Sequence, residues 1–162
     1  MDEINDVANK LVSIGADVIA IPCITAHCFH NKLCENISVK ILNAVDETTE
    51  ELKKSGVKAA GIMATSGTMK CGLFQSALTK AGITPVEPDE AIQSLIMDLI
   101  YKDIKAGKDP DKESFDRIKN YFTDKGGENK LRMLTEREAL RLMGYSDDFK
   151  IVVSRAQMYK QA

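Results

Sequence analysis

A short apolar run that stops at a proline and a cysteine constrains this chain more than any other segment. Residues Val18–Ile21 are uninterrupted apolar positions, which predicts a strand buried on both faces, as in a parallel sheet covered by helices. Because Pro22 has no N–H to donate, the strand is expected to end there and to leave Cys23 at its carboxyl end. In open α/β sheets this edge is where ligands bind. Cys23, with the hydroxyl of Thr25 and the imidazole of His27 close behind it, is therefore a candidate functional site.

The other cysteines and the histidines allow competing interpretations. A cysteine in a strand is often an inert core residue, but the position of Cys23 at a strand end favours a functional role. Cys28 and Cys34 fall in the next, predicted helical segment and are expected to pack in the core. His27 and His30 are one helical turn apart and could bind a metal together with a cysteine. No Cys-x-x-Cys motif or second histidine pair supports such a site, so we expect no metal.

Composition bounds the class of protein. The chain has 162 residues, of which 44% are hydrophobic and 28% charged, as expected for a globular protein of one ordinary domain or two small ones. Its net charge of −2 gives no reason to expect nucleic acid or an anionic membrane as a partner. It has neither an apolar run near the ~20 residues of a membrane span nor a signal-peptide pattern. Four cysteines without a secretory signal predict reduced thiols and a cytoplasmic location.

Helices and short strands alternate in the predicted secondary structure as far as residue 124. Apolar periodicity predicts helices over residues 2–14, 26–34, 46–54, 69–81, 91–106 and 110–124, and strands over 18–21, 39–42, 57–63 and 84–86. Glycines mark four of the helix ends, and Pro110 is expected to open the last of these helices. A chain that opens on a helix, with its first strand after it, is unusual for an α/β domain and suggests that preceding strands are missing.

A Thr/Ser/Gly turn follows the predicted strand 57–63. Thr65, Ser66, Gly67 and Thr68 lead towards the next helix, so their backbone N–H groups and hydroxyls could hold an anion. An ordinary Ser/Thr helix cap would give the same pattern. Beside Cys23, however, the turn forms a second half-site suited to a carboxylate.

The alternation of helices and strands stops near Gly127. Another buried strand is expected there, but no such pattern is found. Residues 129–162 carry more basic than acidic side chains, whereas residues 1–128 are net acidic. Capping-box spacings predict helices over 135–143 and from residue 154 onwards. We therefore expect a short helical tail after residue 128.

Four segments of residues 1 to about 128 carry distinctive motifs, namely 15–27, 41–48, 61–68 with Gln75, and 100–107. In this order they resemble the aspartate/glutamate racemase family, which works without pyridoxal phosphate. The resemblance implies an α/β fold of flavodoxin-like parallel sheet units, with the active site between two domains related by pseudo-symmetry. Residues 1–55 would be the C-terminal part of the first domain and residues 56–128 the N-terminal part of the second, so the fold is expected to be incomplete.

The same resemblance implies a chemistry and a set of residues. In the family, one cysteine thiolate removes the α-proton of an amino acid, and a second thiol delivers a proton to the opposite face. Cys23 corresponds to the first cysteine. The residues expected to hold the substrate carboxylates are Thr25, Thr65, Ser66, Gly67 and Thr68. The implied substrate is aspartate or glutamate, no cofactor is implied, and a homodimer is possible.

Departures from the family pattern bear on activity. Family members usually have Asn after the first cysteine, where this chain has Ile24. The second cysteine is expected just after Gly126, where residues 128–130 are Glu-Asn-Lys. Cys71 is not expected to replace it, because it falls inside a predicted helix. The resemblance therefore implies a racemase homologue that is weakly active or inactive.

Residues 131–162 resemble a different family, the C-terminal end of a cytosine-5 DNA methyltransferase. The matching residues are 132–149 and 154–162, which suggests a fusion of two gene fragments near Gly127. That family also attacks with a Pro-Cys thiolate, but Gln should follow the cysteine and a Phe-x-Gly-x-Gly loop should precede it. Neither is present. A methyltransferase fragment, or a non-catalytic α/β module, is therefore the alternative to the racemase homologue.

Overall fold

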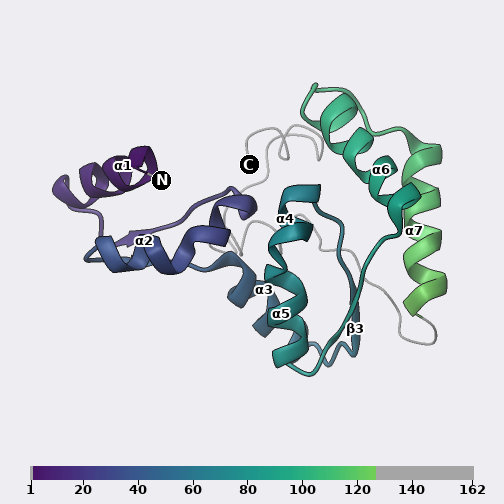
Figure 1. Ribbon diagram of the computed structural model, residues 1–162, viewed down its shortest axis with the longest axis horizontal. Helices are drawn as coiled ribbons and strands as arrows, with labels where there is room; N and C mark the ends of the chain where they lie inside the picture. Colours follow the sequence, from purple (N-terminus) through teal and green to yellow (C-terminus); the bar gives the residue numbers. More distant parts are fainter. Residues whose placement is uncertain (1, 127–162) are drawn as a thin grey trace, which may run out of the picture.

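The computed structural model describes residues 2–126, and residues 1 and 127–162 lie outside the described part. Helices α1 and α2 lie at one end of this part, α6 and α7 lie at the other, and α4 and α5 lie between them (Figure 1). The four short strands form two parallel pairs, β1 with β2 and β3 with β4. The predicted helices over 135–143 and from residue 154, and hence the predicted helical tail, lie outside the described residues.

For description we call residues 2–55 the first unit and the residues that follow the second unit. The first unit contains a parallel strand pair, three α-helices and one 3₁₀ helix, and Leu52 of its last helix packs against the core of the second unit. The elements of the first unit are α1 (Asp2–Ser13), β1 (Val18–Ile19), the 3₁₀ helix η1 (Ile24–Phe29), α2 (His30–Asn36), β2 (Lys40–Ile41) and α3 (Ala44–Lys54). Its core is formed by apolar residues of α1, α2, the residue that follows α2 and both strands, namely Ala8, Leu33, Ile37, Ile19 and Ile41.

Strand β1 is shorter than predicted and is buried on one face. It covers two residues instead of 18–21, and it pairs with β2 in the register Val18 to Lys40 and Ile19 to Ile41. Ile19 is 5% exposed, whereas Val18 is 50% exposed. Because successive side chains of a strand point to opposite faces, only one of the two can enter the core of this unit. The prediction of burial on both faces is therefore wrong for Val18.

The second unit is built around β3 and β4. Its elements are β3 (Ala59–Gly61), α4 (Ser66–Cys71), α5 (Leu73–Lys80), β4 (Thr84–Val86), α6 (Glu90–Asp98), the π-helical segment η2 (Leu99–Ile104) and α7 (Lys112–Gly126). One cluster of its core contains Ile62, Leu78 and Ile83, and another contains Ile92, Ile96, Leu99, Ile118 and Phe122. The second cluster buries one face of α6 against one face of α7.

Several predicted helices have different boundaries. The helix predicted over 26–34 is the 3₁₀ helix η1 followed by α2, and the one predicted over 46–54 begins at Ala44. Two others differ for a clear local reason. The helix predicted over 69–81 begins earlier, at Ser66, because Thr65 caps it, and Gly72 then adopts a positive φ of 68° that separates α4 from α5. The last helix begins at Lys112 rather than Pro110, since the Asp111 carboxylate accepts a hydrogen bond from the Ser114 N–H at 2.8 Å. The helix predicted over 91–106 is α6 followed by η2.

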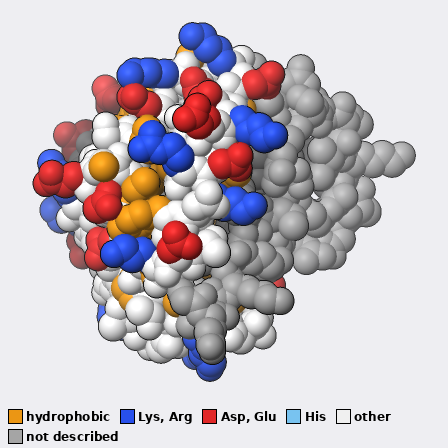
Figure 2. Space-filling model, turned by 90° about the vertical axis from the view of Figure 1, so that its right-hand side faces the viewer, with side chains coloured by type: hydrophobic (Ala, Val, Ile, Leu, Met, Phe, Trp, Pro, Cys, Tyr) orange, Lys and Arg blue, Asp and Glu red, His pale blue; other side chains and the backbone are white. Residues whose placement is uncertain are grey.

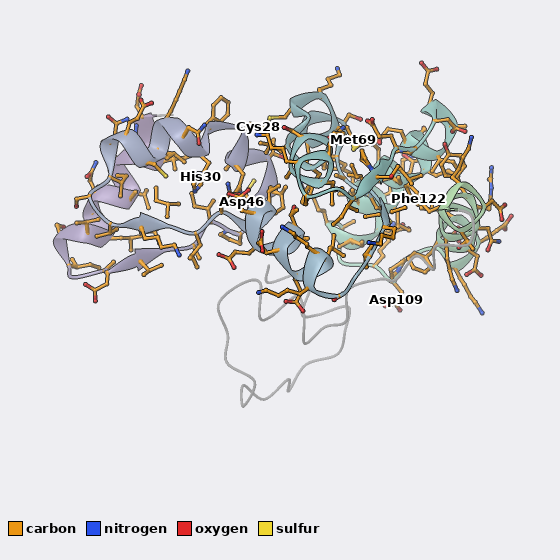
Figure 3. All side chains as sticks on the ribbon, turned by 90° about the horizontal axis from the view of Figure 1, so that it is seen from below. Cys28, His30, Asp46, Met69, Asp109 and Phe122 are labelled. Atoms are coloured by element: carbon orange, nitrogen blue, oxygen red, sulfur yellow. A yellow bond between two sulfur atoms is a disulfide. The ribbon has the colours of Figure 1, made fainter. Side chains whose placement is uncertain are left out.

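A disulfide joins the two units. It links Cys28 in η1 to Cys71 at the end of α4, with the two Cα atoms 6.2 Å apart, and Cys28 lies where the first unit meets α4 (Figure 3). The expectations of four reduced thiols and of Cys28 as a packing residue are therefore wrong for this pair. Sequence spacing could not show the bridge, because pairing depends on the distance and direction between two Cβ atoms.

None of the helices within residues 2–126 combines the length and the apolar character that crossing a bilayer requires.

Candidate functional site

Cys23 stands between β1 and η1 with its side chain exposed. Its backbone is extended, with φ −99° and ψ 105°, and it precedes the first residue of η1. Its carbonyl oxygen accepts two hydrogen bonds, from the Ala26 N–H at 3.0 Å and from His27 Nδ1 at 3.1 Å. The sequence predicts Cys23 at the carboxyl end of the strand, but β1 ends at Ile19, so the thiol lies in the connection from β1 to η1. It is free, and the carbonyl of its own residue is held by hydrogen bonds.

Hydroxyls from the two units meet beside this segment. Thr25 Oγ1 lies 2.9 Å from Thr68 Oγ1, and Thr65 Oγ1 lies 3.2 Å from the same Thr68 atom. Thr65 also caps α4 by accepting the Thr68 N–H at 3.4 Å, and Thr68 itself is 3% exposed. A Cβ placed on Gly67 would lie 3.7 Å from the Thr25 methyl group. The two half-sites expected from the sequence are therefore in direct contact.

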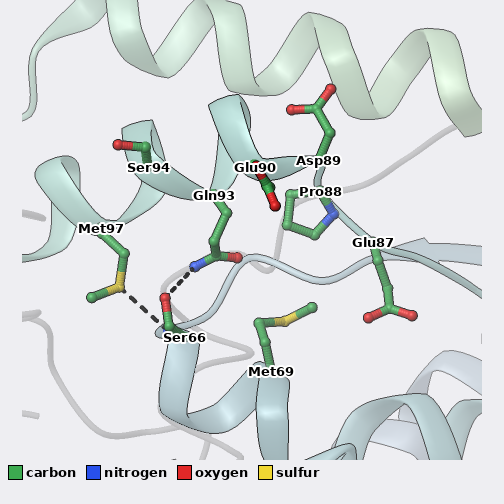
Figure 4. Close-up of a pocket in the computed structure, with 9 residues that line it drawn as sticks. All are labelled: Ser66, Met69, Glu87, Pro88, Asp89, Glu90, Gln93, Ser94 and Met97. Carbon is green, nitrogen blue, oxygen red and sulfur yellow. Dashed lines mark hydrogen bonds between the residues drawn. The ribbon is translucent and has the colours of Figure 1, made fainter.

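Ser66 differs from its neighbours in the turn, because it contacts α6. Its N–H points to Met97 Sδ at 3.3 Å, and its hydroxyl lies 3.5 Å from Gln93 Nε2 (Figure 4). Gln93 Nε2 also donates to the Ala64 carbonyl at 3.0 Å. A side chain of α6 is therefore hydrogen-bonded to the residue that precedes the Thr65–Thr68 turn. Of the residues expected in the site, Ser66 is the one on this side.

A pocket of about 490 Å³ lies on the α6 side of the turn (Figure 4). Its walls combine carboxylates, amide and hydroxyl groups with two thioethers, and are formed by Ser66, Met69, Glu87, Pro88, Asp89, Glu90, Gln93, Ser94 and Met97. Cys23 and Thr25 are not among these residues. Three carboxylates make the pocket less suited to an acidic amino acid than the Thr25–Thr68 contact, so we place the candidate site at Cys23.

Gln93 and His27 make hydrogen bonds to the segments of the candidate site, and the sequence does not predict these contacts. Gln93 stands between Ile92 and Ser94 on α6, which also carries Glu90 and Asp98, so its place in the sequence gives no signal of these contacts. His27 was considered as a metal ligand, but it is 3% exposed and both its ring nitrogens have protein partners: the Cys23 carbonyl and the Ala44 N–H. Within residues 2–126 no group of three or more His, Cys, Asp or Glu side chains is arranged to hold a metal ion.

The remaining cysteines occupy different surroundings. Cys28 and Cys71 are joined, which leaves Cys23 and Cys34 as the free cysteines. Cys34 lies on α2 with its sulfur 3.7 Å from the His30 ring nitrogens. All four cysteines of the sequence are thereby placed. Ile24, where the family usually has Asn, is half-buried at the start of η1.

Charges of both signs lie on one face of the second unit. Acidic and basic side chains are interspersed on the face that carries α6 and α7 (Figure 2). One example is the exposed salt bridge between Lys102 and Asp98, with an N–O distance of 2.8 Å. Among the described side chains visible in this view, basic and acidic groups alternate and no patch of a single sign is seen.

Residues 2–125 match the model of a known family, described as Asp/Glu/hydantoin racemase. The chain belongs to this family. A curated relative, the broad specificity amino-acid racemase RacX of Bacillus subtilis, is 33% identical over 94 residues, which are 56% of this chain and 41% of that protein. The structure of an aspartate racemase from Picrophilus torridus is similar with a TM-score of 0.66 and 30% identity, covering 75% of this chain and 50% of that one.

These matches confirm the predicted family and the α/β fold class with parallel sheet units. The chain spans between two fifths and half of the length of these two racemase relatives. A separate match of 37 residues is 57% identical to the type II methyltransferase M.BsuFI of Bacillus subtilis, covering 23% of this chain and 9% of that protein. The resemblance to part of a methyltransferase is therefore confirmed as well.

Proposed function

We propose that this racemase homologue exchanges the α-proton of aspartate or glutamate at Cys23, without a cofactor, and inverts the stereocentre slowly or not at all. The observation that carries the proposal is the contact between Thr25 and Thr68, with Oγ1 atoms 2.9 Å apart. This contact places the segment that carries the free thiol of Cys23, in one unit, against the Thr65–Thr68 turn of the other unit. We assign these units to residues 1–55 and 56–128, with residues 129–162 as a methyltransferase-like tail.

The proposed roles follow from the chemistry of each group. The Cys23 thiolate takes the proton from Cα, leaving a carbanion and a neutral thiol, and the same thiol returns a proton or a solvent-derived deuteron to the same face. The hydroxyls of Thr25 and Thr65, with the turn through Ser66, Gly67 and Thr68, hold the substrate carboxylates. Proton return to the same face gives exchange with retention of configuration.

Net inversion needs a second donor on the opposite face of the substrate. Cys28 and Cys71 are bonded to each other, and Cys34 lies beside His30 on α2. Loss of a general acid costs about 10²–10⁴-fold in rate. We therefore expect exchange to exceed inversion. In a homodimer, a thiol from a second copy of the chain could supply this second proton. The test below would detect it as formation of the D-isomer.

The test follows isotope and configuration together. L-aspartate and L-glutamate are incubated separately with the protein in D₂O, without added cofactor; loss of the Hα signal is followed by NMR and the isomers are separated by chiral chromatography. We expect loss of Hα with retained L-configuration, abolished in Cys23→Ala and kept in the matched variant Cys34→Ala.

Two results would contradict the proposal. Equal Hα loss in the unaltered protein and in Cys23→Ala would remove Cys23 from the chemistry. Formation of the D-isomer at an ordinary enzymatic rate, about 1–10³ s⁻¹, would show that a second proton donor completes the site. The methyltransferase match covers 9% of its relative and carries no proposal of methyl transfer.

A further inference from the structure

His27 connects the Cys23 backbone to the beginning of helix α3. Its ring is 3% exposed, with Nδ1 3.1 Å from the Cys23 carbonyl oxygen and Nε2 3.2 Å from the Ala44 nitrogen. Ala44 is the first residue of α3, where a backbone N–H has no acceptor within the helix. Asn43 accepts the next two N–H groups, from Val45 and Asp46, so His27 completes the cap.

These two contacts determine which nitrogen carries the proton. A backbone N–H can only donate, so Nε2 of His27 must present its lone pair to Ala44. A carbonyl can only accept, so Nδ1 must carry the hydrogen that it donates to Cys23. His30 has the reverse arrangement, because its Nε2 lies 3.1 Å from the carbonyl oxygen of Ile41 and must donate to it. The two rings stack with centroids 6.0 Å apart and an interplanar angle of 6°.

We propose that His27 is a positioning residue, whose neutral Nδ1–H form holds the Cys23 carbonyl by a hydrogen bond and thereby orients the Cys23 thiol. The role in orientation rests on the proposed function of Cys23. Every neutral imidazole has one donor and one acceptor nitrogen, so the partners of the two nitrogens, and not their opposite roles, carry the proposal. The donor holds the carbonyl of the candidate catalytic cysteine, and the acceptor anchors the ring at the first N–H of α3.

The first test reads the proton directly and needs no substrate. The chain has two histidines, so ¹⁵N labelling of histidine gives two rings, which His30→Gln assigns. We expect His27 to show a protonated Nδ1 and an unprotonated Nε2, with the opposite pattern for His30. A protonated Nε2 on His27 would break the contact with Ala44 and overturn the proposal.

The second test separates the two contacts with a matched pair of variants. In His27→Asn the amide nitrogen lies near the position of Nδ1 and can still donate to Cys23. In His27→Gln the amide oxygen lies near the position of Nε2 and can accept from Ala44, but the donor to Cys23 is lost. Losing one such hydrogen bond shifts a local equilibrium by about tenfold. We therefore expect His27→Gln to lower the rate of Hα exchange about tenfold, and His27→Asn to lower it about threefold or less.

Two control measurements distinguish an effect of His27 on the position of Cys23 from an effect on protein stability, and they do so even if the proposed function fails. Urea unfolding of both variants measures stability, and the ¹³C resonance of the Cys23 carbonyl reports its geometry without any substrate. A shifted carbonyl resonance in His27→Gln but not in His27→Asn supports positioning, even if the unaltered protein exchanges no Hα and the proposed function fails. Two results would contradict positioning: Hα exchange rates that fall only in proportion to the loss of unfolding free energy, or equal shifts of the Cys23 carbonyl resonance in both variants. Either result would mean that His27 only stabilises the core.

Discussion

At the scale of single residues, two glycines of the second unit face different neighbours. A Cβ on Gly61 would lie 2.7 and 2.9 Å from ring atoms of Phe122, whereas a Cβ on Gly67 would lie 3.7 Å from its nearest neighbour. Gly61→Ala must displace a buried ring of α7, so we expect a loss of about 1–3 kcal/mol in the free energy of unfolding. Gly67→Ala, inside α4, should be neutral or stabilising by up to about 1 kcal/mol. Urea unfolding of the two variants measures the difference, and equal losses would contradict it.

Gly67 also allows stability to be separated from substrate access. Its added methyl group would contact the Thr25 methyl, on the side where the two half-sites meet. Under the proposed function we expect Gly67→Ala to fold at least as well as the unaltered chain and yet to lose Hα exchange with aspartate. Unchanged exchange in this variant would mean that the substrate does not approach the turn at Gly67.

At the scale of elements, the cap of α7 makes a prediction about pH. The pKa of Asp111 lies below its ordinary value, because its carboxylate accepts hydrogen bonds from the backbone and the hydroxyl of Ser114. A carboxyl with a lowered pKa in the folded state contributes stability above its unfolded pKa, and this contribution is lost as the pH falls through the folded pKa. Asp111→Asn keeps a capping oxygen that does not titrate.

The measurement is the difference in unfolding free energy between the unaltered chain and Asp111→Asn at several pH values. We expect the difference to favour Asp111 at about pH 5 and to shrink towards about pH 2, below the ordinary aspartate pKa near 3.9. A difference that is constant over this range would show that the Asp111 charge contributes nothing to α7.

Element positions were largely predictable, because local chemistry sets them. Gly15, Gly56 and Gly82 all have positive φ just after a helix, as their places in the sequence suggest. Gly72 lies inside an apolar helical pattern, and that pattern does not say whether a glycine continues or breaks a helix. The separation of α4 from α5 therefore required the folded structure.

The sequence suggests the residues of the candidate site but not their arrangement. Cys23 is suggested by the apolar run that stops at Pro22, and the Thr65–Thr68 turn is suggested by its turn chemistry. Their contact through Thr25, and the two hydrogen bonds of His27, join segments far apart in the sequence, and only packing brings such segments together. The clearest failure was Cys28, whose partner lies 43 residues away.

At the scale of the whole molecule, the Cys28–Cys71 disulfide and the Thr25–Thr68 contact restrain the same junction. Both join η1 to α4, so the bridge holds together the two segments that carry the candidate site. Closing a loop of 43 residues stabilises the folded state by about 4 kcal/mol in the chain-entropy description. We therefore expect reduction to lower the free energy of unfolding by about this amount.

Alkylation followed by mass spectrometry, together with urea unfolding, checks the bridge. In denaturant without reductant we expect two labelled cysteines, Cys23 and Cys34, and four after reduction. Reduction should no longer change stability in the double variant Cys28→Ser/Cys71→Ser, and it should still do so in the control Cys34→Ser. Four labelled cysteines before reduction would contradict the bridge. If the bridge also maintains the site, then the reduced chain, at a urea concentration where it is still folded, should exchange Hα of aspartate more slowly than the bridged chain.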